Sequence, residues 1–273
     1  MWLIIVFSIL VLFLYILIAC IIGTIRKNWG TMDVFYGPAY FIVAFTSLYL
    51  LYRSTNIISI RQIIVTTLIL IWALRLAIYV HIRNRGKPED RRYAFMRKRW
   101  KEKGKNVFLK SFTNIYLFQG LVIFIVVFPT LWINVNENPQ ITNIFEFSAI
   151  TLWLGVILWI IGFYFESVGD YQLYKFLNNP NRTKRVMDEG LWKYTQHPNY
   201  FGESLMWWSI FIIALAIPWG FITIFGPIYI TFQIINVSGV KLLNKIHKGD
   251  DEFAEYRKRT STFIPWFPKK KQK

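Results

Sequence analysis

A short polar stretch, YTQHPNYFGE at positions 194–203, carries the side chains that are best suited to chemistry. Its hydrogen-bonding side chains include His197, Asn199, Tyr200 and Glu203. Pro198 suits the first turn of a helix, which would make His197 the capping residue. The free N–H groups and positive dipole end of such a helix favour an anion. We therefore expect this stretch to form one wall of a site for a ligand that bears phosphate or carboxylate.

Further polar side chains lie inside, or at the ends of, otherwise apolar segments. They are Asp33, Tyr36, Tyr40, Arg75, His81, Gln119, Glu166, Asp170, Gln233 and Asn236. Ionisable groups in membrane spans are costly and usually functional, and a buried arginine needs a carboxylate or phosphate partner. We expect Arg75 to pair with an acid of similar depth (Glu166, Asp170 or Glu203) or with a cofactor phosphate.

The elements that position these residues are membrane helices. The chain has 273 residues, of which 55% are apolar and 19% aromatic, and this composition indicates a multi-pass membrane protein. About 20 apolar residues cross a bilayer. Seven stretches qualify, at 2–22, 34–52, 60–82, 112–133, 146–166, 199–217 and 219–238. The expected fold is all-α, a polytopic bundle forming a single membrane domain over residues 1–273, with a tight turn at 217–220 between the last two spans.

The distribution of Lys and Arg predicts the orientation of the bundle. The loop 83–110 holds twelve of them, whereas 134–145 holds none. Because cytoplasmic loops carry the positive charge, we expect the N-terminus outside and the C-terminus in the cytoplasm. The polar groups then fall in the cytoplasmic half and predict a wet cavity open to the cytosol. The same rule explains the net charge of +17 without nucleic acid.

Two further observations limit the chemistry. The single Cys20 excludes an internal disulfide and a Cys-x-x-Cys metal site. The three histidines, at positions 81, 197 and 247, are too scattered to predict a zinc site, so no metal is expected.

Several motifs resemble one known family. GLWKYTQHPNYFGE resembles the signature of the steroid 5-alpha-reductase-like membrane proteins, in the subgroup DUF1295. Four other stretches resemble family patterns in the same order: WALRLAIYVHIRNRG followed by EDRRY, ESVGDYQLYKF, VSGVKLLN and EYRKRTSTFIPWFP. The resemblance extends over nearly the whole chain after about residue 30.

The resemblance implies an NADPH-dependent reductase of a carbon–carbon double bond conjugated to a carbonyl in a lipid. It implies that NADPH enters from the cytosol and lies against the C-terminal spans and cytosolic loops, with the hydrophobic substrate entering from the bilayer. The chain has no GxGxxG motif, which suits a family without a Rossmann fold. The implied cofactor residues are Asp170, Asn199, Tyr200 and Glu203, with Arg75, Arg92 and Tyr93 as further candidates, and the stretch around His197 is expected to line this site.

Two departures from the family pattern matter, one removing an expected positive charge and one concerning the substrate. Gln196 stands where many relatives have Arg, and Trp72 stands where the steroid branch has a Tyr. The acid that polarises the substrate carbonyl therefore does not transfer from the family. A tyrosine hydroxyl or protonated carboxyl could stabilise negative charge on that oxygen in a dry site. Our candidates are Tyr36 and Tyr40, with Asp33 as their partner, although tyrosines here could instead form an interfacial aromatic belt.

Two other functions stay open at this point. Membrane methyltransferases of the isoprenylcysteine type share a His-Pro-x-Tyr-x-Gly element and bind S-adenosylmethionine, although Asn199 and Glu203 fit the reductase pattern better. A non-catalytic lipid-binding protein on the same fold is the third possibility. The ending Lys270-Lys271-Gln272-Lys273 has the form of an endoplasmic-reticulum retrieval signal, but in a bacterial plasma membrane it would be positive-inside charge.

Overall fold

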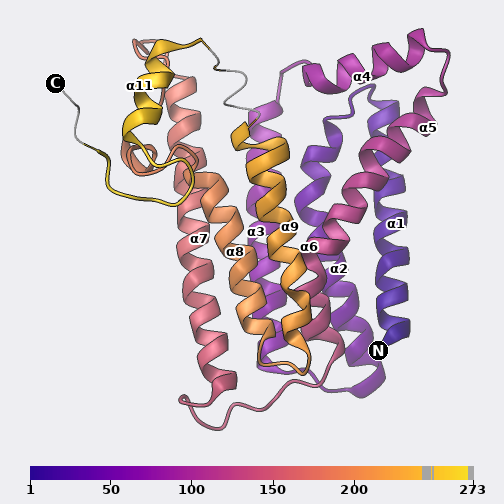
Figure 1. Cartoon of the computed structure of the whole chain (residues 1–273). Coiled ribbons are helices and arrows are strands. Elements are labelled where there is room, and N and C mark those ends of the chain that lie inside the picture. The colour runs from indigo at the N-terminus through magenta and orange to yellow at the C-terminus, as the bar shows by residue number, and fades with distance from the viewer. Residues whose placement is uncertain (242–246, 248, 270–273) are drawn as a thin grey trace. The chain divides into compact units, whose positions relative to one another are not determined.

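A computed structural model describes residues 1–241, 247 and 249–269 of the chain (Figure 1). The regular elements of these residues are helices, with one isolated β-bridge between Thr195 and Ser261. The chain divides into two compact units, Met1–Ser148 with Ala214–Thr223 and Ala149–Ile213 with Ile224–Lys273. The all-α prediction is confirmed, and the prediction of a single membrane domain stays a prediction.

The first unit contains the N-terminal long helices and one polar helix. Its elements are α1 (Trp2–Ile25), α2 (Thr31–Thr55), α3 (Ile60–Asn84), α4 (Arg91–Glu102), α5 (Val107–Ser111), a π-helical turn (Phe112–Leu117) and α6 (Phe118–Val135). The π-helical turn joins α5 to α6, so one continuous apolar helix extends from Val107 to Val135. The highly charged helix α4 was not predicted, because it contains no apolar run.

Local sequence signals explain where α2 ends and α3 begins. Asn56 adopts a left-handed conformation with φ 54°, which terminates α2. Ser59 then starts α3 with a capping box: its hydroxyl accepts from Gln62 N, and the Gln62 side chain accepts from Ser59 N at 2.8 Å. Farther in, buried Asn134 of α6 donates to Ala44 O at 2.9 Å and so fastens α6 to α2.

The second unit contains the polar stretch YTQHPNYFGE at positions 194–203. Its elements are α7 (Phe147–Leu177), a 3-10 turn (Gly190–Lys193), α8 (Pro198–Ala214), α9 (Phe225–Gln233), a π-helical turn (Ile234–Ser238) and α11 (Asp251–Arg259). The 3-10 turn Gly220–Ile224, which belongs to the first unit up to Thr223, precedes α9. In the predicted tight turn, Gly220 N–H donates to Ile217 O at 2.8 Å.

Helix α7 is 31 residues long and differs from the predicted segment 146–166. No proline interrupts it before Pro180, and the residues after Glu166 are compatible with a helix, so it continues to Leu177. Asp170 therefore lies inside the helix rather than at its end.

Six helices among the described residues are long and apolar enough to cross a membrane. They correspond to six of the seven predicted spans, so the chain is a multi-pass integral membrane protein. The other predicted span, 199–217, corresponds to α8, which has 17 residues. That length is at the short end of what a bilayer core requires.

Candidate cofactor and substrate sites

The predicted site residues are distributed over both units. The first unit contains Asp33, Tyr36 and Tyr40 on α2, Arg75 on α3, and Arg92 and Tyr93 on α4; the second contains Asp170 on α7 and His197, Asn199, Tyr200 and Glu203 at the start of α8.

In the first unit, Asp33 and Tyr93 are brought together from distant parts of the chain. The Tyr93 hydroxyl donates to Asp33 Oδ1 at 2.9 Å. Burial, followed by the charge of Asp33, raises the pKa of Tyr93, so this hydroxyl stays protonated and serves as a donor. The contact attaches α4 to the start of α2 and gives the part-buried Asp33 carboxyl group a partner on α4.

Tyr36 and Tyr40 form a second pair on the same helix. Tyr40 donates from its hydroxyl to the Tyr36 hydroxyl at 2.6 Å, and its ring lies edge-on to Trp72 with centroids 5.2 Å apart. Tyr40 is fully buried. This burial contradicts an aromatic belt facing lipid at Tyr40.

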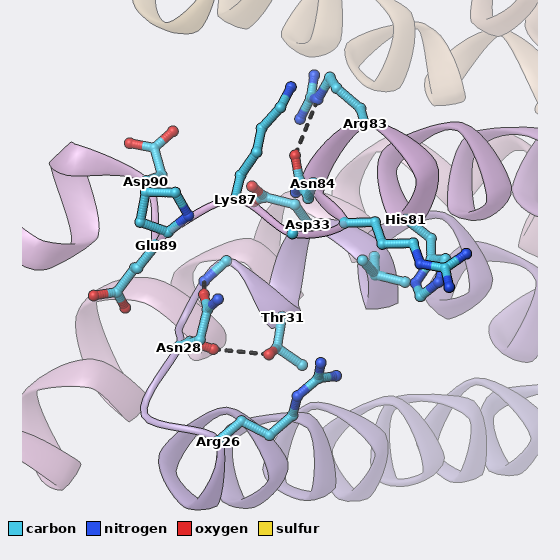
Figure 2. Close-up of a pocket in the computed structure, with 15 residues that line it drawn as sticks. Arg26, Asn28, Thr31, Asp33, His81, Arg83, Asn84, Lys87, Glu89 and Asp90 are labelled. Carbon is cyan, nitrogen blue, oxygen red and sulfur yellow. Dashed lines mark hydrogen bonds between the residues drawn. The ribbon is translucent and has the colours of Figure 1, made fainter.

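A cavity of about 380 Å³ opens beside Asp33 (Figure 2). Arg26 reaches it from the end of α1, while Arg83, Arg85 and Lys87 come from the end of α3 and the loop that follows. None of these four cations forms a salt bridge with a described residue, although Arg83 Nε donates to Asn84 Oδ1 at 3.2 Å. Arg83 also interacts electrostatically with Asp33 and Asp90, which line the same cavity. The cavity therefore has an excess of positive charge.

Two acidic residues at this cavity, Asp90 and Glu89, already have arginine partners. Asp90 accepts two hydrogen bonds from the Arg92 guanidinium, at 3.1 and 3.0 Å, and these hold the pKa of Asp90 below its usual value. Glu89 forms an ion pair with Arg97 and also accepts from Trp29 N at 2.8 Å. Arg92, a predicted cofactor residue, is thus paired with Asp90. The basic loop 83–110 was predicted as a source of counter-charge for a ligand, but Arg26, Arg83, Arg85 and Lys87 were not predicted individually, because their composition matches ordinary positive-inside loops.

In the second unit, Asp170 and Asn199 are brought together as a pair. Asn199 Nδ2 donates to Asp170 Oδ1 at 2.9 Å, whereas the buried Asn199 Oδ1 has no hydrogen-bond partner among the described residues. A close approach of α7 and α8 allows this contact, since a Cβ atom on Gly169 would lie 3.1 Å from Asn199 N. The pair therefore presents an acceptor that a ligand N–H or O–H group could satisfy.

His197 is buried directly before α8. Its ring stacks on Tyr200 with centroids 5.3 Å apart, and neither ring nitrogen has a hydrogen-bond partner in the described part of the chain. Burial lowers the pKa of His197 to about 4, so the imidazole is neutral near neutral pH. Its carbonyl accepts the first helical hydrogen bond, from Phe201 N at 3.0 Å, which agrees with the predicted capping position.

The remaining candidates stay predictions. The Arg75 guanidinium lies over the Tyr79 ring at 5.3 Å, while the acids expected to pair with Arg75 belong to the other unit. No group of three or more His, Cys, Asp or Glu side chains that could hold a metal occurs among the described residues. The tail Lys270–Lys273 and the last three residues of VSGVKLLN, 242–244, lie outside the described residues.

Gln196 has a structural contact that the sequence did not reveal. Its Nε2 donates to Thr260 O at 2.7 Å, and its backbone N–H donates to Ser261 O at 2.8 Å. The residue that replaces the expected arginine thus fastens the C-terminal segment beside the start of α8.

Comparisons with known proteins return a single family. The model of a family described as "Protein of unknown function (DUF1295)" matches residues 19–260. No curated protein matches the chain, and no solved structure matches it.

Proposed function

Because this chain belongs to the DUF1295 family, whose motifs resemble the steroid 5-alpha-reductase-like proteins, we propose that it is an NADPH-dependent membrane reductase. Its substrate would be a lipid with a carbon–carbon double bond conjugated to a carbonyl. The proposal is supported by the multi-pass helical architecture, by the cationic cavity beside Asp33 and by two pairs of polar side chains in positions that the sequence predicted.

The observation that carries the proposal is the excess of positive charge at the cavity. Arg26, Arg83, Arg85 and Lys87 line it without a salt bridge to a described residue. Guanidinium groups bind phosphate through paired hydrogen bonds, and an ammonium group binds it as a point charge. NADPH carries three phosphates, whereas S-adenosylmethionine carries a positive sulfonium and no phosphate. The cavity thus favours the reductase over the methyltransferase.

Different residues of the chain would bind the cofactor and the substrate. The four cations would hold the phosphates at the mouth of the cavity, and Asp33, fixed by Tyr93, would shape its inner wall. Bound NADPH supplies a hydride. Tyr36, oriented by the hydrogen bond from Tyr40, would donate a hydrogen bond to the substrate oxygen as negative charge develops there. The buried surroundings of Tyr40 would keep water away from this donor.

The predicted cofactor residues of the second unit fit a polar ligand as well. The unsatisfied Asn199 Oδ1 can accept a hydrogen bond from an amide or a ribose hydroxyl group. Because a buried polar atom without a partner is costly, ligand binding there would recover part of that cost. We propose that Asn199, whose side-chain amide is held by Asp170, binds a polar ligand in this way within the second unit. The family resemblance implies that this ligand is NADPH.

Calorimetric titration with NADPH tests the function. The purified protein is expected to bind NADPH, and Arg85→Glu with Lys87→Glu is expected to weaken binding by more than tenfold, because a hydrogen bond to a charged group contributes about 1.5–3 kcal/mol. Raising the salt concentration should weaken binding to the parent protein and have less effect on the variant. Asn199→Ala should weaken NADPH binding by about 1–3 kcal/mol.

A matched control uses the same charge reversal outside the cavity. Lys103 and Lys105 are exposed in the turn after α4 and do not line it. Lys103→Glu with Lys105→Glu should therefore leave NADPH affinity within about twofold, as expected for screened surface charges. Binding of S-adenosylmethionine alone would move the protein to the methyltransferase function. Failure to bind either cofactor, with lipid retained through purification, would favour the non-catalytic lipid-binding function.

We also propose seven spans, with α8 as the sixth, an external N-terminus and the cationic cavity facing the cytoplasm. In a Cys20→Ser background, a cysteine at position 140 should react with an impermeant thiol reagent in intact cells. Cysteines at positions 103 and 181 should react only after permeabilisation, because their loops are rich in Lys and Arg. Labelling of positions 103 and 140 from the same side would contradict this topology.

A further inference from the structure

The last described residues fold back against the start of α8. Trp266 N–H donates to Tyr194 O at 2.9 Å, and the Thr195 hydroxyl donates to Phe263 O at 2.8 Å. Together with the two hydrogen bonds from Gln196, these contacts hold the C-terminal segment in one register beside residues 194–196. The position of this segment within the second unit is therefore well defined.

Large apolar side chains of this segment face outward. Ile264 is 64% exposed, Trp266 71% and Phe267 78%. Prolines at positions 265 and 268 favour an extended chain here. Phe267 meets the half-exposed Tyr194 edge-on, with centroids 6.2 Å apart. These three large apolar side chains lie within four residues and form a patch whose exposure to water is unfavourable.

The length of α8 places this patch at the level of a membrane interface. Helix α8 begins at Pro198 and has 17 residues, which corresponds to about 25 Å. A hydrocarbon core is about 30 Å thick, so a spanning α8 must begin at the edge of that core. Tyr194 lies only a few residues before this helix start, and Trp266 is hydrogen-bonded to it. Interfacial depth is where Trp and Tyr side chains concentrate in membrane proteins.

Positive charge accompanies the patch. A cavity of about 240 Å³ beside it is lined by Asp188, Lys193, Arg259, Thr260, Pro268 and Lys269. Its single carboxylate, Asp188, already pairs with Arg259 and with Lys184. Lys193 and Lys269 are exposed and form no salt bridge with a described residue. This combination of exposed apolar groups and uncompensated cations is complementary to an anionic bilayer surface.

We propose that residues 264–267 form an interfacial anchor that lies in the headgroup region of the membrane, and that Lys193 and Lys269 bind the phosphates of anionic lipids there. This role is independent of the reductase function. The anchor would hold the C-terminal segment, which is hydrogen-bonded to residues 194–196. The conformation of the residues before α8 would therefore depend on lipid composition.

Fluorescence of a label next to the patch tests the proposal. In full-length Cys20→Ser protein, Thr262→Cys provides an exposed attachment site for an environment-sensitive dye and leaves the apolar side chains intact. In nanodiscs, lipids spin-labelled near the headgroup should quench this dye, and admixing phosphatidylglycerol with phosphatidylcholine should increase quenching. A dye at Asn181→Cys, in an exposed loop of the same unit, is the control and should be quenched little.

Two sets of variants separate the apolar and ionic parts of the anchor. Trp266→Ser with Phe267→Ser should abolish quenching in both lipid mixtures. Lys193→Glu with Lys269→Glu should remove the increase caused by phosphatidylglycerol, since each lysine near an anionic surface accounts for about a fivefold change in association. Quenching at position 262 equal to that at 181 would overturn the proposal. So would a signal that follows the number of protein copies per nanodisc instead of the lipid, because a second copy would then cover the patch.

Discussion

Replacing Gly202 by alanine is expected to destabilise the second unit by about 1–3 kcal/mol, the usual cost of overpacking, and replacement by valine is expected to cost more. A Cβ atom on Gly202 would lie 2.5 Å from Glu166 N and closer still to Gly162 O. These neighbours are backbone atoms of α7 and cannot rotate away. Helices α7 and α8 would therefore have to separate, which would also disturb the hydrogen bond between Asn199 and Asp170.

The measurement is the thermal midpoint of the detergent-solubilised protein. Alanine has a higher helix propensity than glycine by about 1 kcal/mol, so a lower midpoint for Gly202→Ala would isolate the packing effect. Ile157→Phe adds volume at a position of α7 that is 55% exposed and should leave the midpoint unchanged. An unchanged or higher midpoint for Gly202→Ala would show that α7 and α8 do not pack this closely.

The sequence predicted the elements of this fold better than their ends. Apolar runs of sufficient length located six candidate spans, and Pro198 located the start of α8. The extension of α7 to Leu177 was missed, because a helix can continue beyond the apolar run that crosses the membrane. Helix α4 was missed for the opposite reason, since its residues are polar and carry no membrane signal.

Contacts between candidate site residues could be predicted only where the residues are close in sequence. Tyr36 and Tyr40 are one turn apart, so their contact follows from helical spacing. The cavity beside Asp33 combines Arg26 with residues almost 60 positions later, and no local pattern distinguishes such cations from charge that sets topology. The fold-back of Trp266 onto Tyr194 uses backbone groups, which the side-chain pattern does not encode.

Lowering the pH from 7 to 5 is expected to destabilise the protein through His197. Burial lowers the pKa of this imidazole to about 4, whereas an unfolded histidine has a pKa of about 6.5. Above pH 6.5 the side chain is neutral in both states and contributes no pH dependence. As the pH falls below 6.5, the unfolded state binds a proton first, so stability is lost progressively until the folded pKa is reached. The loss attributable to His197 is about 2 kcal/mol at pH 5 and about 3 kcal/mol at full protonation.

The substitution His197→Phe identifies this contribution. Phenylalanine keeps an aromatic ring to stack on Tyr200 and cannot titrate, so the fall in thermal midpoint between pH 7 and 5 should become shallower in the variant. The same change at the exposed His81 is the matched control and should preserve the parent slope. Equal slopes for His197→Phe and the parent protein would mean that His197 is protonated in the folded state or reaches solvent.

A buried, neutral imidazole beside Asn199 would keep the start of α8 free of fixed positive charge. Electrostatic attraction for an anionic ligand in this unit would then come from the helix dipole and exposed lysines rather than from the histidine.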